Sequence, residues 1–123
     1  MLRKAIFFAG LLTMYYCSAN AQTLIKSYSS ISNFARIGNE LFYAADDGVH
    51  GLELWKTDGT SGGTVMVKDI YSGYYSSGVS SITSFNGKIY FVAYDGINGS
   101  EVWQSDGTAQ GTKMLKDIFP GSG

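Results

Sequence analysis

The chain has 123 residues, which is enough for one small domain. Charged residues make up 15% and aromatic residues another 15%, with 16 glycines and one proline, a composition typical of a β-rich globular protein rather than a disordered one. The formal net charge of −1 provides no basic field, which argues against nucleic acid or an anionic membrane surface as a partner.

The first 21 residues have the three parts of a secretory signal peptide. Arg3 and Lys4 come first, an apolar run of twelve residues follows, and an A-x-A pattern ends at Ala21. We predict a signal-peptide helix (residues 1–21), cleavage after Ala21, and a secreted or cell-surface location without a membrane span in the remaining chain. The alternatives are a lipoprotein signal centred on Cys17 and a buried amino-terminal helix.

Cleavage after Ala21 changes the chemistry available to the rest of the chain. Seven basic and ten acidic residues would remain, for a net charge of −3. Cys17 is the only cysteine and would leave with the signal peptide. The remaining chain would therefore have no disulfide, no cysteine-based zinc site and no thiol nucleophile.

Two copies of one sequence unit follow, at an offset of 48 residues. The stretch "ELWKTDGTSGGTVMVKDI" begins at Glu53 and matches "EVWQSDGTAQGTKMLKDI", which begins at Glu101, without a gap. The two units span residues 29–76 and 77–123. The recurring residues are Glu53, Trp55, Asp58, Gly59, Thr60, Gly63, Thr64, Lys68, Asp69 and Ile70 in the first unit, and Glu101, Trp103, Asp106, Gly107, Thr108, Gly111, Thr112, Lys116, Asp117 and Ile118 in the second.

Each unit predicts a four-stranded antiparallel meander. Asn86-Gly87 is a type I′ hairpin signal, and the runs around it are rich in β-branched and aromatic residues. The run Lys88–Tyr94 is almost continuously apolar, which predicts a strand buried on both faces. In the second unit the predicted strands are Val79–Phe85, Lys88–Tyr94, Ser100–Ser105 and Thr112–Ile118, and the last strand of the first unit is Val65–Ile70.

The predicted fold class is all-β, with two meanders that resemble the blades of a β-propeller. A unit of about fifty residues with four strands fits a blade in length. One such meander cannot bury its apolar face alone, so we expect the two units to stack on each other. A β-sandwich and an open β-solenoid of stacked meanders are the alternatives.

The recurring "ELWKTDGT" and "EVWQSDGT" stretches resemble the ELWxxDGT repeat of secreted bacterial proteins, especially those of Bacteroidetes. The resemblance implies a propeller-like, exported repeat protein, often with a carboxy-terminal sorting domain for type IX secretion, and it implies no activity. This chain has two units and no sorting domain, and two units cannot close a ring of four to eight blades. We interpret it as a fragment of a longer repeat protein, or as a chain whose copies assemble.

The recurring acids have two interpretations. Asp47, Asp58, Asp95 and Asp106 each precede a glycine, and such residues typically accept hydrogen bonds from turn amides. Clustered carboxylates also suit Ca²⁺, which makes these four residues weak calcium candidates, although their spacing does not match an EF-hand loop. We favour turns and expect no cofactor.

A carboxylate pair within one unit is the only candidate for catalysis. Glu53 with Asp58, and Glu101 with Asp106, would each supply the two acids that glycoside hydrolysis needs. A pair that recurs in every unit favours an architectural role, since an active site is normally unique.

The other recurring side chains also favour architecture. We expect Trp55 and Trp103 to be packing anchors between units, with sugar stacking as the alternative. Lys68 and Lys116 are expected to be exposed and paired with acids across strands. His50, whose counterpart is Asn98, lies in a loop where a residue tolerant of left-handed backbone is useful.

Two functions follow as hypotheses. The first is an exported, non-catalytic scaffold for binding or adhesion at the cell surface, because the sequence shows no hydrolase, metalloprotease or nucleotide-binding motif. Its expected partners are other repeats of the same or neighbouring chains and a surface protein or glycan. The alternative is the amino-terminal part of a larger secreted enzyme that acts on polysaccharide or protein.

Overall fold

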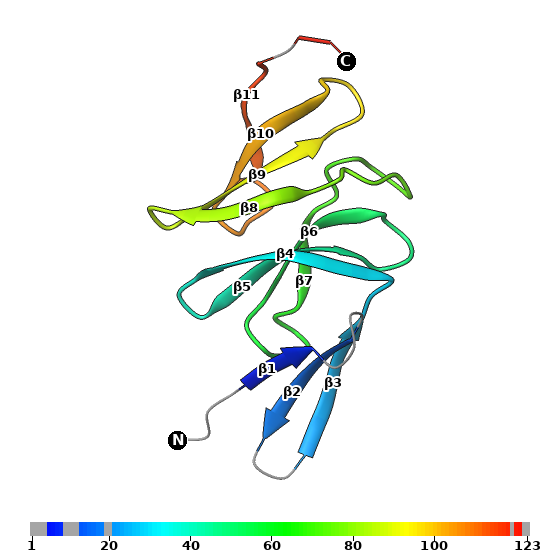
Figure 1. The fold of residues 1–123 in the computed structure, drawn as a ribbon, viewed down its shortest axis with the longest axis vertical. Helices are drawn as coiled ribbons and strands as arrows, with labels where there is room; N and C mark the ends of the chain where they lie inside the picture. The colour runs from blue at the N-terminus through cyan, green and yellow to red at the C-terminus, as the bar shows by residue number, and fades with distance from the viewer. Residues whose placement is uncertain (1–4, 9–12, 19–20, 119, 122–123) are drawn as a thin grey trace.

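The computed structural model describes residues 5–8, 13–18, 21–118 and 120–121. Strands and turns make up these residues, and no helix occurs among them. Three antiparallel sheets follow one another along the long axis of the molecule (Figure 1). The all-β fold class and its two four-stranded meanders are therefore confirmed.

The first sheet contains β1 (Ala5–Phe8), β2 (Thr13–Ser18) and β3 (Ala21–Ser27), paired in that order. It occupies part of the segment for which the sequence predicts a signal-peptide helix. Residues 1–4, 9–12 and 19–20 lie outside the described ones, so the signal peptide and its cleavage remain predictions. Within the part of the chain that the structure describes, no helix is long and apolar enough to cross a membrane.

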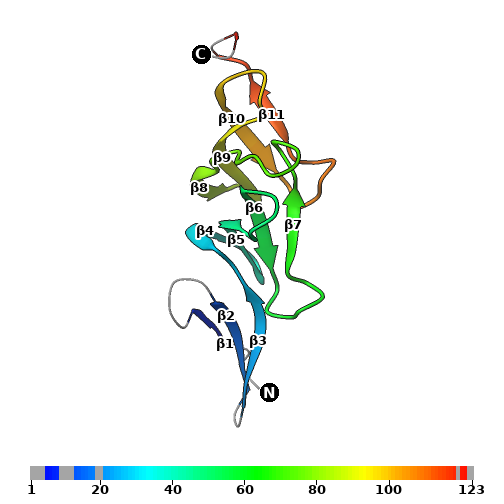
Figure 2. The ribbon, with the colours of Figure 1, turned by 90° about the vertical axis from the view of Figure 1, so that its right-hand side faces the viewer.

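Two meanders with the same topology make up the rest of the fold. The first meander contains β4 (Ser30–Ile37), β5 (Glu40–Asp46), β6 (Leu52–Thr57) and β7 (Val65–Lys68), paired in chain order. The second meander contains β8 (Ser80–Phe85), β9 (Lys88–Tyr94), β10 (Ser100–Ser105) and β11 (Lys113–Lys116), also paired in chain order. Figure 2 shows the two meanders stacked, with β7 and β11 on the same side.

The turn predicted at Asn86-Gly87 is confirmed. Both residues have positive φ, 47° and 73°, as a type I′ turn requires. At the equivalent place the first meander has Gly38 at a φ of 55°, followed by Asn39 at negative φ. This is the type II′ pattern, in which glycine takes the first central position.

The outer strands end earlier than predicted. The sequence predicts strand to Ile70 and to Ile118, but β7 ends at Lys68 and β11 at Lys116. The amides of Ile70 and Ile118 leave the ladder because each donates to a glutamate carboxylate, at 3.0 and 2.9 Å respectively. The prediction was wrong here because strand propensity does not reveal a side chain that captures a backbone amide.

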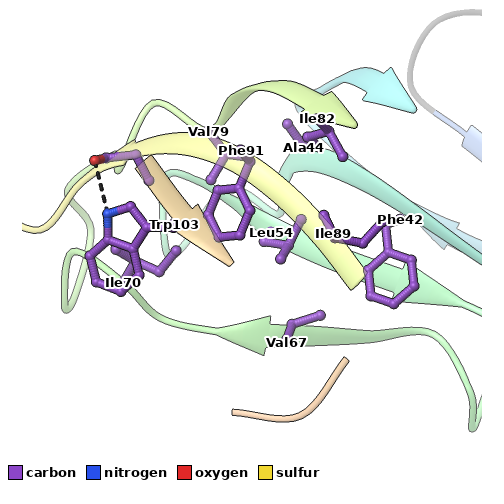
Figure 3. Packing of buried hydrophobic residues seen from close by; sticks show 11 residues of the cluster. Phe42, Ala44, Leu54, Val67, Ile70, Val79, Ile82, Ile89, Phe91 and Trp103 are labelled. Atoms are coloured by element: carbon purple, nitrogen blue, oxygen red, sulfur yellow. Dashed lines mark hydrogen bonds between the residues drawn. The ribbon is translucent and has the colours of Figure 1, made fainter. Parts of the chain in front are cut away.

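The main core lies between the two meanders (Figure 3). The indole Nε1 of Trp103 donates to the carbonyl of Ala93 at 3.1 Å, and its ring lies 6.5 Å from that of Phe91. Trp103 is buried in a core cluster that contains residues of both meanders, as expected of a packing residue. The buried residues of this core are Phe42, Ala44, Leu54, Val67, Ile70, Val79, Ile82, Ile89, Phe91, Ala93 and Trp103.

Trp55 lies on the opposite face of the first meander, away from the second. Tyr28 packs edge-on against it at 5.3 Å between ring centroids and bonds to the hydroxyl of Tyr43. The ammonium of Lys26 lies 4.7 Å from the Trp55 ring centroid. Trp55 is therefore also a buried packing residue, but its neighbours come from the segment before β4 and from β5.

The strand buried on both faces is β5, not the predicted β9. Four consecutive residues of β5, Phe42 to Ala45, are buried, whereas β9 alternates between buried and half-buried residues. The first meander is covered on one face by the second meander and on the other by the segment that contains Tyr28. Among the residues that the structure describes, the second meander is covered on one face, which is why the prediction for β9 was wrong.

This difference predicts unequal costs for two equivalent substitutions. Leu54→Ala should lower the free energy of unfolding by about 2–5 kcal/mol, because it leaves a cavity between the meanders. Val102→Ala, at the equivalent half-buried position, should cost about 1 kcal/mol or less. Urea denaturation followed by tryptophan fluorescence measures both, and equal losses would contradict this packing.

Candidate functional site: the recurring polar residues and a tyrosine cluster

The turn after β6 is built by the recurring Asp, Gly and Thr residues. The Oδ1 atom of Asp58 accepts hydrogen bonds from the amide and the hydroxyl of Thr60, at 2.9 and 2.6 Å. The hydroxyl of Thr60 in turn accepts from the amide of Gly63 at 2.9 Å. The second meander repeats these three bonds among Asp106, Thr108 and Gly111.

A chain of hydroxyl groups lies beneath this turn. Thr64 donates to the carbonyl of Thr60 at 2.6 Å, so its oxygen is left to accept from Thr57, also at 2.6 Å. The hydroxyl of Thr57 accepts from the amide of Gly59 at 3.0 Å. Ser105, Gly107, Thr108 and Thr112 form the same chain in the second meander. These hydroxyls satisfy one another and the turn, which is a structural use of the DGT motif.

The loop after β5 uses its aspartate in the same way. The Oδ1 atom of Asp47 accepts from two backbone amides at 2.9 Å, and that of Asp95 from two at 2.8 Å. His50 Nδ1 lies 2.8 Å from the other oxygen of Asp47, and the Asn98 amide donates to Asp95 at 2.7 Å. The turn role predicted for these acids is confirmed. The left-handed backbone predicted for His50 was wrong, since glycines on either side take the positive φ.

The four candidate aspartates do not come together as a calcium site in the described part of the chain. The carboxylates of the four candidate aspartates already accept hydrogen bonds within their own turns. Among the residues that the structure describes, no group of three or more His, Cys, Asp or Glu side chains is placed to hold a metal ion. Asp69 and Asp117 each keep one buried carboxylate oxygen, Oδ1, without a hydrogen-bond partner among these residues. Calcium binding remains a prediction.

Glu53 connects the third strand to the chain that leaves the meander. Its carboxylate is fully buried and accepts from the amides of Ile70 and Tyr71, at 3.0 and 3.2 Å, and from the hydroxyl of Ser77 at 2.8 Å. The carbonyl of Ser77 accepts from the amide of Tyr94 in the second meander at 2.8 Å. Burial raises the pKa of Glu53 to about 7, against the opposite effect of the hydrogen bonds from Ser77 and the two amides.

The candidate carboxylate pair is not brought together. Glu53 is buried within β6, whereas Asp58 follows the end of that strand in an exposed turn. They are five positions apart along an extended segment, which spans about 16 Å at about 3.3 Å per residue. Glycosidases place their two carboxyl groups about 5–10 Å apart. The pair therefore lacks the geometry for glycoside hydrolysis.

Lys68 differs from its expected role. It is half-buried, and its ammonium donates to the carbonyl of Thr112 at 3.0 Å and lies 6.0 Å from the ring centroid of Trp103. The predicted exposed, cross-strand pairing with an acid was thus wrong, because Lys68 reaches the other meander instead. Lys116, at the equivalent position, is exposed as predicted.

A tyrosine cluster lies where the two meanders join, and the sequence reasoning missed it. The cluster consists of Tyr71, Tyr74, Tyr75 and Tyr94. The ring of Tyr75 is 4.7 Å from that of Tyr71 in a stacked arrangement and 4.4 Å from that of Tyr74, and the Tyr71 and Tyr94 rings meet edge to face at 5.2 Å. Tyr74 is 75% exposed and donates its hydroxyl proton to Tyr75 at 3.0 Å.

Glycine makes room for this cluster. A Cβ atom on Gly96 would lie 2.7 Å from the ring of Tyr71, and Gly96 has a φ of 89°. The signal available in the sequence was a break in the repeat. The equivalents of the four tyrosines at the offset of 48 are Phe119, Ser122, Gly123 and Asp46. The tyrosine cluster occurs in one unit only, unlike the recurring residues, which stabilise the fold of both units.

Comparison of the chain with protein-family models, with curated proteins and with solved structures finds no match. The assignment of a function therefore depends on the residues and the geometry described above.

Two neighbouring glycines test the turn after β6. A Cβ atom on Gly63 would overlap the carboxylate of Asp58, whereas one on Gly62 would meet nothing within 4 Å. Gly63→Ala should displace that carboxylate from its donors and cost about 1–3 kcal/mol. Gly62→Ala should be neutral or slightly stabilising. Thermal unfolding of the two variants checks this, and similar melting temperatures would argue against the turn geometry.

Glu53 predicts a pH dependence of stability. Its folded-state pKa of about 7 lies above the ordinary value of 4.5, so the folded state binds the proton more tightly. The contribution of Glu53 is therefore fully present below about pH 4.5, is lost as the pH rises towards 7, and then stays constant. Chemical denaturation of the wild type and of Glu53→Gln across pH 4–8 isolates it. A constant difference between the two proteins over this range would refute the assignment.

Proposed function

We propose that the chain is an exported, non-catalytic β-repeat module of the ELWxxDGT type, which binds a ligand at the cell surface or outside the cell. The tyrosine cluster is its ligand-contact surface. A glycan fits this surface best as a ligand, because sugar rings present CH faces that stack on exposed aromatic rings.

The hydrogen bonds of the recurring residues support a non-catalytic role for the chain. The carboxylates of Asp58, Asp106 and Glu53 accept bonds from turn and exit amides, and the threonine hydroxyls bond to one another. Groups used in this way maintain the backbone of each unit. The hydroxyl–carboxylate pairs among them, Thr60 with Asp58 and Thr108 with Asp106, recur in both turns and also bind the turn amides, which favours a structural role over that of a nucleophile with its base.

The tyrosine cluster is the observation that carries the binding proposal. Its rings are held by one another, by the edge contact with Tyr94 and by the backbone next to Gly96, so little side-chain entropy is left to lose on binding. Tyr74 nevertheless keeps most of its surface in water. Exposed and ordered aromatic rings are typical of ligand-contact surfaces.

The test is binding of the exported chain to a panel of immobilised oligosaccharides. Tyr74→Ala should weaken binding to the bound glycans about tenfold, which corresponds to about 1.4 kcal/mol. Phe85→Ala is the matched control, because Phe85 is also an exposed aromatic residue but lies in the β8–β9 hairpin outside the cluster. Equal binding by both variants, or no glycan retained by the wild type, would contradict the proposal.

A further inference from the structure

Two equivalent faces of the meanders differ in whether another element packs on them. One face of the first meander packs against the second meander and is buried. The equivalent face of the second meander, here called the outer face, is covered by none of the described elements. The buried positions are Phe42, Ala44, Leu54 and Val67, and their equivalents on the outer face are Tyr90, Val92, Val102 and Leu115.

The outer face keeps the apolar character of a packed face. Tyr90, Val92 and Val102 lie on adjacent strands and are half-buried, and Leu115 is 54% exposed. Val67, the equivalent of Leu115, is 6% exposed. The contrast comes from the covering partner and not from the residue type, because all of these side chains are large and apolar or aromatic.

One hydrogen bond between the two meanders also has an equivalent pair of residues, of which the lysine lies on the second meander. Lys68 on the first meander donates to the carbonyl of Thr112 on the second. Lys116 is the equivalent of Lys68 and is exposed, and the equivalent of Thr112 is Thr64 on the first meander. The interface inside the chain thus provides a template for a second one, with an apolar centre and one lysine-to-carbonyl bond.

We propose that the outer face of the second meander binds the first meander of a second copy of this chain. The contact is head-to-tail, with Lys116 donating to the carbonyl of Thr64 in that copy. The first meander of the second copy would contribute the face that carries Tyr43, Ala45 and Trp55. These residues are the equivalents of Phe91, Ala93 and Trp103, through which the second meander packs against the first within one chain. This inference is independent of the glycan-binding proposal.

The segment before β4 controls access to the partner face. Tyr28 covers Trp55, and Figure 1 places the β1–β3 sheet on the side of the first meander away from the second. The predicted cleavage after Ala21 would remove β1 and β2, the sheet partners of β3, and would leave Tyr28 in the chain. Binding of the second copy therefore requires Tyr28 to move off Trp55, and we expect the loss of β1 and β2 to free its segment to do so. A head-to-tail contact leaves one free face at each end, so association continues into a ring or a filament.

Sedimentation velocity of the exported chain tests this assembly, with mass spectrometry to locate its amino terminus. The wild type should form species larger than a dimer in a concentration-dependent manner. Leu115→Glu places a charge on the outer face and should leave monomers. Ile97→Glu is the matched control: Ile97 is 71% exposed, and its equivalent Val49 is 63% exposed although the first meander packs against the second. It should assemble like the wild type.

A mixing experiment distinguishes head-to-tail contact from two outer faces that pair with each other. Met66→Glu places a charge on the partner face, at a half-buried position beside the Trp55 cluster. Each variant alone should be monomeric. An equimolar mixture of Leu115→Glu and Met66→Glu should form dimers and nothing larger, because one intact face of each kind remains.

A wild type that stays monomeric, or assembly by Leu115→Glu alone or by Met66→Glu alone, would overturn the proposal. If circular dichroism shows that a glutamate variant is unfolded, Lys116→Met replaces it, because the side chain of Lys116 is exposed and its backbone pairing with Val102 does not depend on the side chain. It should weaken association about tenfold through loss of the lysine-to-carbonyl bond. Unchanged association of Lys116→Met would also overturn the proposal.

Discussion

A four-stranded meander has two faces, and in this fold an apolar face is buried where another element packs on it. Inward and outward side chains alternate along each strand, so a strand with apolar residues at every position is buried along its whole length when it has a neighbour on each side. β5 meets this condition, with Phe42 and Ala44 against the second meander and Tyr43 and Ala45 towards Tyr28. The stacking direction, the burial of Trp103 and the reach of Lys68 all follow from this packing.

The sequence predicted the strands well because turn chemistry marks their ends. Asn86-Gly87 and the Asp-Gly pairs require positive φ at glycine or asparagine, and the runs between them are suited to a pleated sheet. The predicted Lys88–Tyr94 and Ser100–Ser105 are the observed bounds of β9 and β10. Local signals of this kind are contained in a few adjacent residues, which is why one sequence is sufficient to read them.

The features that the sequence did not predict depend on residues far apart in the chain. Glu53 captures the amide of Ile70, 17 residues away, and Lys68 reaches a carbonyl 44 residues away. Which face of a meander is covered depends on what packs there, so equivalent side chains such as Val67 and Leu115 have different exposure. The tyrosine cluster was visible in the sequence only as a departure from the repeat, and its stacked geometry comes from the way the two meanders meet.

Ser77 gives the connection between the meanders a consequence for folding. Its hydroxyl bonds to Glu53 of the first meander, and its carbonyl accepts from Tyr94 of the second. Unfolding of either meander therefore removes one hydrogen-bond partner of Ser77, a buried residue that is also bonded to the other meander. The two sheets share one junction as well as one core, so we expect them to melt as a single cooperative unit and not as two independent modules.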